Sequence, residues 1–143
     1  MRRAIILVLD SLGIGASADA DHYGDTGADT LGHIAVACAA NQANRKGLRQ
    51  GPLKIPNLLR WGLGAAALGS RGVPLDVLNP PQADIQGAWG HARELSKGKD
   101  TPSGHWEICG VPVTFEWGFF PAQDNCFPAS LLQDIMQQGG VGD

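Results

Sequence analysis

The sequence predicts an α/β domain in which helices pack against a mostly parallel sheet. The continuous apolar run at 4–9, Ala-Ile-Ile-Leu-Val-Leu, is typical of a central strand that is buried on both faces. Apolar residues then recur at helical spacing from Leu31 to Ala39. Short apolar runs return at 85–92 and 111–115 and predict a second and a third strand. Strands that alternate with helices along a chain are typical of α/β folds.

The predicted helices are bounded by residues that favour helix ends. Asp29 or Thr30 is suited to cap the first helix, because its side-chain oxygen can accept a hydrogen bond from an N–H group of the first turn. Each of three later helices begins at a proline, whose missing N–H costs nothing there. They are predicted at 57–61 after Pro56, at 103–109 after Pro102, and from Pro128 to a stop at Gly139-Gly140. Residues 65–84, rich in Ala, Gly and Pro, are predicted to be a connector.

The composition is that of a loop-rich single domain without a nucleic-acid or membrane partner. The 143 residues include 20 Gly and 9 Pro, and the net charge is only −3. Lysine and arginine are scattered rather than gathered in the basic patch that nucleic-acid binding requires. The apolar run at 4–9 ends at Asp10, well short of the ~18 apolar residues of a membrane helix. The cysteines, Cys38, Cys109 and Cys126, are far apart and predict free thiols in the cytoplasm.

Asp10 is the first candidate site residue. It follows the predicted strand at 4–9, at the edge where open α/β sheets gather their ligands. A carboxylate in that place suits a divalent metal, and the same metal would reach Thr101 if the strands that precede the two residues are neighbours. The alternative is a solvated loop aspartate that caps the next turn.

Thr101 is the second candidate, because the stretch Lys-Asp-Thr-Pro-Ser-Gly-His-Trp-Glu at 99–107 predicts a hydroxyl nucleophile at a helix N-terminus. Pro102 suits the first helical position, which makes Thr101 the predicted N-cap. The free N–H groups of the next turn and the helix dipole favour a phosphate beside the Thr101 hydroxyl. The Lys-Gly-Lys loop at 97–99 is suited to approach that phosphate. The alternative is that Thr101 only caps the helix.

A loose match to the dinucleotide fingerprint lies at 13–18, Gly-Ile-Gly-Ala-Ser-Ala. A true fingerprint opens a helix directly, and a second strand with a terminal acidic residue follows about 20 residues on. The next segment, 19–29, is instead polar and contains Gly24 and Gly27. The sequence therefore favours a sharp turn here over nicotinamide or flavin binding.

Five stretches together resemble the phosphopentomutase (phosphodeoxyribomutase) family of the alkaline phosphatase superfamily, in the same order and across nearly the whole chain. They are VLDSLGIGA at 8–16, GADTLGHIA at 27–35, GPL and IPNL within 51–58, GKDTPSGHWEICGVPV at 98–113 and FEWGFF at 115–120. The resemblance implies a partial alkaline-phosphatase-like core at 1–115 and the beginning of a cap domain at 116–143.

The resemblance also implies an isomerase that moves phosphate between the 1 and 5 positions of ribose or 2-deoxyribose. It interconverts ribose 1-phosphate or 2-deoxyribose 1-phosphate with the 5-phosphate, and a sugar bisphosphate is both intermediate and activator. Thr101 matches the threonine that is phosphorylated and that touches metal. Asp10 matches a ligand of the two manganese ions. Metal lowers the pKa of the hydroxyl and neutralises phosphoryl oxygens, which agrees with these roles.

The chain departs from the family in length, because family members are considerably longer and take their remaining metal ligands from a later part of the core. None of the four histidines matches those ligands by position. The sequence is therefore expected to be an N-terminal fragment that is inactive alone, since one carboxylate and one threonine do not complete a two-metal site. The alternative is a non-catalytic or partner-dependent fragment. The four histidines are His22, His33, His91 and His105.

Overall fold

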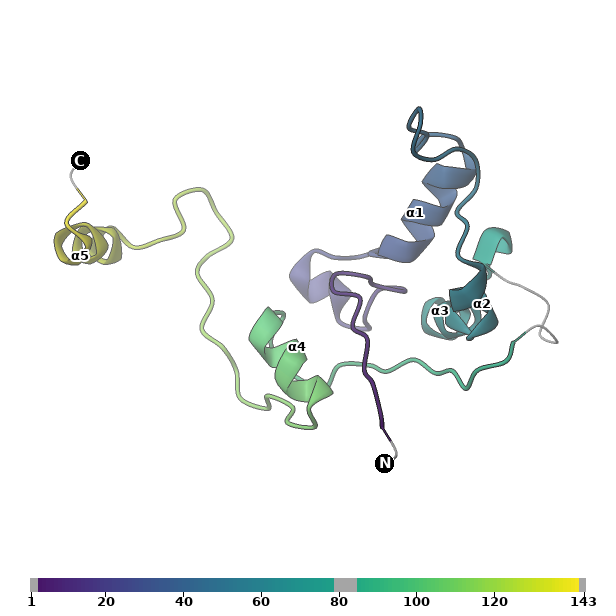
Figure 1. Cartoon of the computed structure of the whole chain (residues 1–143). Helices are drawn as coiled ribbons and strands as arrows, with labels where there is room; N and C mark the ends of the chain where they lie inside the picture. The colour runs from purple at the N-terminus through teal and green to yellow at the C-terminus, as the bar shows by residue number, and fades with distance from the viewer. Residues whose placement is uncertain (1–2, 79–84, 142–143) are drawn as a thin grey trace. The chain divides into compact units, whose positions relative to one another are not determined.

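A computed structural model describes residues 3–78 and 85–141, and every regular element among them is a helix (Figure 1). In chain order they are the 3-10 helix η1 (Ala20–Tyr23), α1 (Thr30–Ala39), α2 (Pro56–Arg60), α3 (Leu63–Arg71), the 3-10 helix η2 (Asp76–Leu78), α4 (Thr101–Ile108) and α5 (Ala129–Gly139). The chain divides into two compact units, residues 1–94 and 95–143. The predicted division into core and cap at residue 115 remains a prediction.

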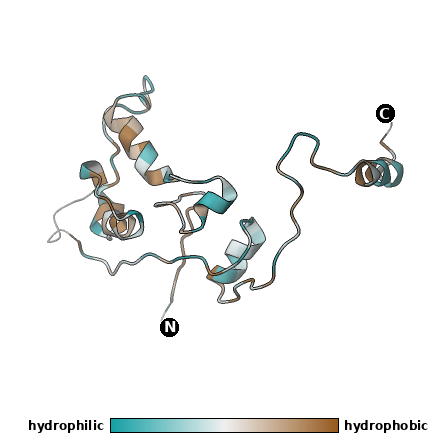
Figure 2. Cartoon of the chain, turned by 180° about the vertical axis from the view of Figure 1, so that it is seen from behind, coloured by the Kyte–Doolittle hydropathy of each residue, from teal (hydrophilic) through white to brown (hydrophobic). Residues whose placement is uncertain are grey.

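The core of the first unit is small and lies where α1, α3 and η2 meet. Leu31, Ala35, Ala67 and Leu78 are buried in it, each at most 3% exposed. Figure 2 shows the hydrophobic stretches of the chain in brown, among them parts of these helices. Partly buried apolar side chains surround them, from residues 12, 14, 53, 55, 59, 63 and 75. The predicted helical spacing from Leu31 to Ala39 is thus confirmed as α1.

Asp29 is the residue that caps α1, which decides between the two predicted caps. Its Oδ1 accepts a hydrogen bond from the Gly32 N–H at 3.0 Å. Its Oδ2 forms an ion pair with Arg71 Nε at 2.6 Å, and both side chains are almost buried. Because Arg71 ends α3, the carboxylate joins the start of one helix to the end of another.

Helix α3 corrects the prediction of a connector over 65–84. The run Leu63-Gly64-Ala65-Ala66-Ala67-Leu68 consists mostly of good helix formers, and the Gly and Pro content of the later residues concealed it. Gly62 has φ of 102°, which lets the chain turn sharply between α2 and α3. A Cβ at Gly64 would collide with the Leu78 carbonyl oxygen, so glycine permits the close approach of η2. Residues 79–84 lie outside the described residues.

The three predicted strands, at 4–9, 85–92 and 111–115, are not formed in the described part of the chain. Its only β pairing is an isolated antiparallel bridge between Arg45 and Arg49. A parallel strand needs neighbours for its N–H and C=O groups and for both of its faces. The run at 4–9 has none: Ile5, Ile6 and Leu7 are 79–81% exposed. The parallel sheet is therefore not confirmed.

The second unit contains α4 and α5. Helix α5 ends at Gly139, and its C-cap Gly140 has φ of 60°, the left-handed conformation that the glycine pair predicts. Ahead of α4, the Lys97 N–H donates to the Val113 carbonyl at 3.0 Å, and Val113 is buried. All three cysteines are free, as the sequence predicts. None of the helices in the described residues has the length and apolarity that crossing a bilayer requires.

Candidate functional site

Asp10 lies in a tight turn at the end of the apolar run. The Leu12 N–H donates to the Leu9 carbonyl at 3.4 Å, so Asp10 and Ser11 are the central residues of the turn. Ser11 has φ of 60°, which glycine or asparagine adopts more readily than serine. Asp10 Oδ1 accepts the Ser11 N–H at 3.0 Å, and its carboxylate is exposed. The exposed carboxylate is what the metal interpretation requires, and its hydrogen bond to the Ser11 N–H is what the turn-capping interpretation requires.

Thr101 is not the N-cap of α4; it is the first residue of the helix, and Asp100 is the cap. Asp100 Oδ1 accepts a hydrogen bond from the Ser103 N–H at 2.8 Å. Ser103 is the third residue of the helix, two residues after Thr101. The predicted cap is therefore wrong: aspartate caps as well as threonine does, and Pro102 occupies the second helical position instead of the first. Since Asp100 does the capping, the exposed Thr101 side chain is not needed for it.

The first turn of α4 offers fewer free N–H groups than the sequence predicts. Pro102 has none, the Ser103 N–H donates to the Asp100 carboxylate, and the Gly104 N–H donates to the Asp100 carbonyl at 3.2 Å. The Asp100 carboxylate also adds a negative charge beside Thr101. An anion at this helix end would therefore need positive charge from elsewhere, from a metal ion or from lysine.

Ser103 is the most enclosed polar residue of the second unit, with no exposed surface. Its Oγ donates to Asp100 Oδ2 at 2.7 Å and accepts from Trp117 Nε1 at 3.0 Å. The ring of Trp117 packs edge-on against Phe115, with centroids 4.9 Å apart. One turn later, His105 Nδ1 donates to the Thr101 carbonyl at 2.8 Å, since a carbonyl only accepts. The start of α4 is thus stabilised by hydrogen bonds within the helix end and by contacts with the segment at 115–117.

Glu107 holds the other end of α4 to the preceding loop. Its carboxylate accepts from the Leu95 N–H at 2.6 Å, the Ser96 N–H at 2.8 Å and the Ser96 hydroxyl at 2.5 Å. The Ser96 Oγ in turn accepts the Val113 N–H at 3.0 Å. The hydrogen bond from the Ser96 hydroxyl, followed by that from the Leu95 N–H, lowers the pKa of Glu107 below its ordinary value of 4.5. A helix of eight residues needs such contacts, because it is too short to be stable alone.

Glu107 should make the stability of the folded chain depend on pH in the acid range. In the unfolded chain the carboxyl takes up its proton near its ordinary pKa of 4.5, and in the folded chain only at lower pH. Its contribution is therefore complete above pH 4.5 and is lost as the pH falls through the lower folded pKa. Thermal unfolding of Glu107→Gln should show a lower midpoint at neutral pH and a flatter acid limb than the parent chain.

Glu116→Gln is the matched control, because that carboxylate is 81% exposed and forms a surface ion pair with Lys97 Nζ at 3.2 Å. Such surface pairs contribute little. An equal loss of stability in both variants, or an unchanged acid limb in Glu107→Gln, would contradict this role of Glu107.

Asp10 and Thr101 each fit a metal site as one ligand. Both offer oxygen, the donor that manganese and magnesium prefer. Asp10 belongs to the first unit and Thr101 to the second. Across residues 3–78 and 85–141, no three side chains of His, Cys, Asp or Glu gather as a group that would hold a metal ion. The described residues thus supply ligands of the predicted kind without completing a site around either.

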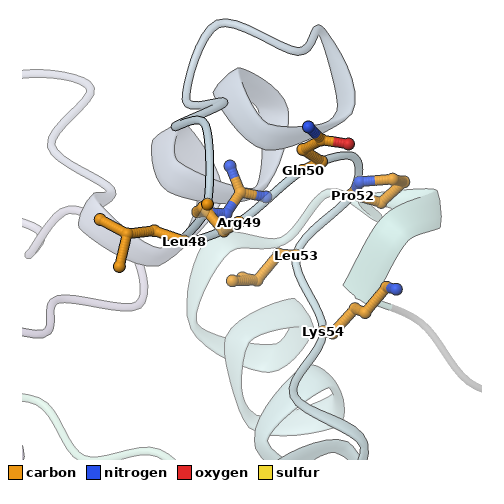
Figure 3. Close-up of a pocket in the computed structure, with 7 residues that line it drawn as sticks. Leu48, Arg49, Gln50, Pro52, Leu53 and Lys54 are labelled. Atoms are coloured by element: carbon orange, nitrogen blue, oxygen red, sulfur yellow. The ribbon is translucent and has the colours of Figure 1, made fainter.

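Neither Asp10 nor Thr101 lines either of two hollows in the first unit. The one in Figure 3 is lined by residues 47–50 and 52–54. Its Arg49 guanidinium donates to the Ala43 carbonyl at 2.7 Å and to the Gly51 carbonyl, so it ties the loop together. A second hollow, of about 760 Å³, is lined by the glycine loop at 12–18 together with residues 69–70 and 91–94. The element after that loop is the 3-10 helix η1 and not the α-helix of a dinucleotide fingerprint.

Comparison with known proteins supplies the context for these residues. The model of the metalloenzyme superfamily matches residues 2–131. The phosphopentomutase of Pectobacterium carotovorum subsp. carotovorum (strain PC1) is 57% identical over 141 residues, 99% of this chain and 34% of the relative. That of Methylobacterium nodulans is 53% identical over 142 residues, and that of Yersinia pestis bv. Antiqua (strain Angola) is 58% identical over 141, with the same two coverages. The chain spans about a third of the length of these curated relatives, and no solved structure matches it.

Proposed function

Because this chain belongs to the metalloenzyme superfamily, we propose that it is the nucleophile-bearing N-terminal part of a phosphopentomutase. The proposed reaction interconverts ribose 1-phosphate or 2-deoxyribose 1-phosphate with the corresponding 5-phosphate. The observation that carries the proposal is the first turn of α4, where Asp100 caps the helix and leaves the exposed Thr101 hydroxyl available. The identity of 53–58% to three phosphopentomutases over this chain supports it.

Thr101 is the proposed phosphoryl carrier. An oxygen of the sugar attacks the phosphorus of phosphothreonine, the bond between phosphorus and Thr101 Oγ1 breaks, and a sugar bisphosphate forms. The other phosphoryl group then moves back to Thr101 Oγ1, which leaves the isomeric monophosphate. This cycle needs a sugar bisphosphate as activator whenever Thr101 has lost its phosphate.

Asp10 and Thr101 are the proposed metal ligands from this part of the protein, and manganese is the proposed metal. Bound manganese would neutralise phosphoryl oxygens and lower the pKa of the Thr101 hydroxyl. The need for such charge agrees with the first turn of α4, whose N–H groups are largely occupied and whose cap is a carboxylate. The Asp10 carboxylate, exposed at the end of the apolar run, is the oxygen ligand proposed from the first unit.

The domain arrangement and location follow from the same proposal. We propose that residues 1–115 belong to the metal-binding core and that 116–143 begin the cap. The aromatic and proline-containing stretch Glu-Trp-Gly-Phe-Phe-Pro at 116–121 supports a change of domain there. Free thiols and sugar phosphate substrates favour the cytoplasm.

The proposal is tested in a chimera in which residues 1–143 replace the matched third of the Pectobacterium relative. With manganese, ribose 1-phosphate and a trace of sugar bisphosphate, the chimera should form ribose 5-phosphate. The isolated chain should not, because Asp10 and Thr101 are too few ligands for two ions. A folded chimera that is inactive where the parent relative is active would contradict the proposal.

Asp10→Asn in the chimera should raise the manganese concentration needed for half-maximal activity by about tenfold or more, because a charged ligand is lost. Asp21→Asn is the control, since Asp21 is 71% exposed in η1 and is not a proposed ligand. Equal manganese titrations of the two variants would remove Asp10 from the site.

A further inference from the structure

A relay of hydrogen bonds passes through the buried Ser103 and joins Trp117 to Asp100, the residue that precedes Thr101. Trp117 Nε1 donates to Ser103 Oγ at 3.0 Å, and Ser103 Oγ donates to Asp100 Oδ2 at 2.7 Å. The Ser103 N–H donates to the other oxygen, Asp100 Oδ1, at 2.8 Å. Both oxygens of Asp100 are therefore held by one residue, and the single proton of the Ser103 hydroxyl is directed to Asp100 because the indole N–H only donates.

The surroundings of the relay fix its geometry. Ser103 has no exposed surface, so water does not compete for its hydroxyl. Phe115 packs edge-on against the Trp117 ring, with the ring planes at 67°. Gly98 is buried against the same groups: a Cβ there would lie 2.5 Å from both Asp100 Oδ2 and Trp117 Nε1. Because glycine has no side chain, position 98 leaves room for the Trp117 indole and the Asp100 carboxylate on either side of Ser103 Oγ.

The relay acts on Thr101 in two ways. Asp100 has extended backbone, with φ of −146° and ψ of 156°, and the helix begins at the very next residue. Holding the Asp100 side chain against Ser103 therefore restrains the backbone where the chain enters α4, directly before Thr101. It also fixes the place of the Asp100 negative charge beside Thr101, because both carboxylate oxygens accept hydrogen bonds from Ser103.

We propose that Trp117 is a positioning residue for Thr101, acting through Ser103 and Asp100. The inference rests on the proposed function for its catalytic consequence and on the structure alone for the positioning itself. Trp117 lies 16 residues beyond Thr101, at the start of the segment proposed to lead into the cap.

The first test uses nuclear magnetic resonance on the 143-residue chain, which needs no catalysis. Trp117→Phe keeps a ring against Phe115 but removes the indole donor. It should shift the Thr101 amide and methyl signals and speed hydrogen exchange at the Ser103 amide by about tenfold. Trp106→Phe is the control: Trp106 lies in α4, is 51% exposed, and its ring makes no hydrogen bond to the described residues. Unchanged Thr101 signals in Trp117→Phe, or equal changes in the control, would overturn the positioning role.

The second test measures kcat and KM separately in the chimera. Trp117→Phe and Ser103→Ala should each lower kcat by about tenfold, while KM changes less than about threefold. The kcat of the double variant should be no lower than that of Ser103→Ala, because both substitutions remove the same relay. Trp106→Phe should stay within about twofold of the parent. A Trp117→Phe variant with shifted Thr101 signals but an unchanged kcat would overturn the catalytic consequence. An inactive unsubstituted chimera would contradict the proposed function, and the resonance test would still decide the positioning.

Discussion

Replacing Thr101 by alanine is expected to abolish phosphoryl transfer in the chimera, lowering kcat by roughly a thousandfold or more, because no atom remains to accept the phosphoryl group. Thr101→Ser keeps the hydroxyl and should retain measurable turnover. Both rates are measured by following ribose 5-phosphate formation with manganese and sugar bisphosphate present.

The loss should be chemical and not a failure to fold. Thr101 is exposed, and the α4 cap is provided by Asp100, so Thr101→Ala should change the free energy of unfolding by no more than about 0.5 kcal/mol. Turnover retained in Thr101→Ala would contradict the carrier role. A large loss of stability would instead mean that Thr101 has a structural role that its exposed position does not suggest.

The second large effect is expected at Gly98, where a side chain does not fit. A Cβ there would lie 2.5 Å from Asp100 Oδ2 and would overlap the Trp117 ring, which Phe115 packs against. Gly98→Ala should therefore lower the free energy of unfolding by about 1–3 kcal/mol, as overpacking does, and should lower the activity of the chimera as well. Urea unfolding followed by tryptophan fluorescence measures the stability.

Gly104→Ala is the control with the opposite expected sign. Gly104 lies inside α4, and a Cβ added there meets nothing within 4 Å. Alanine should stabilise the helix by about 0.5–1 kcal/mol, because glycine is the poorer helix former. If both alanine variants lose stability equally, the close packing at Gly98 is not the cause.

The helices that the sequence predicts correctly are those with local signals at their ends. Asp29 caps α1, Pro56 begins α2, and Gly140 caps the end of α5, each within the segment that the signal bounds. Helix α3 escaped prediction because its alanine-rich start is followed by Gly and Pro residues that suggested a loop. Local chemistry thus decides most helix ends. The average composition of residues 65–84 wrongly predicted a connector where α3 forms.

Strands are not predicted by local signals in the way that helix ends are. An apolar run such as 4–9 indicates burial on two faces, but the burial depends on neighbouring strands, and none pairs with it in the described residues. The 79–81% exposure of Ile5, Ile6 and Leu7 leaves that apolar surface available to a partner or to further chain. Sheet formation is a property of several segments together.

The candidate site, like the sheet, depends on contacts between segments that the sequence does not predict. The stretch at 99–107 correctly predicts the helix but wrongly predicts Thr101 as its cap, because Asp100 is an equally good cap and accepts the Ser103 N–H. The contact between Ser103 and Trp117 joins residues 14 apart, and no spacing rule predicts it. Nonlocal hydrogen bonds of this kind set the geometry of the nucleophile and are visible only in three dimensions.

The most direct measurement is the position of a phosphoryl group on the protein. The active chimera is incubated with sugar bisphosphate and digested, and the peptide that contains residues 99–107 is fragmented in a mass spectrometer. We expect one phosphoryl group on Thr101. We also expect excess ribose 5-phosphate to remove it, because the sugar accepts the group and becomes the bisphosphate. The presence of the phosphoryl group on Ser103 instead, or an active enzyme whose Thr101 is never phosphorylated, would contradict the assignment of Thr101 as the phosphoryl carrier.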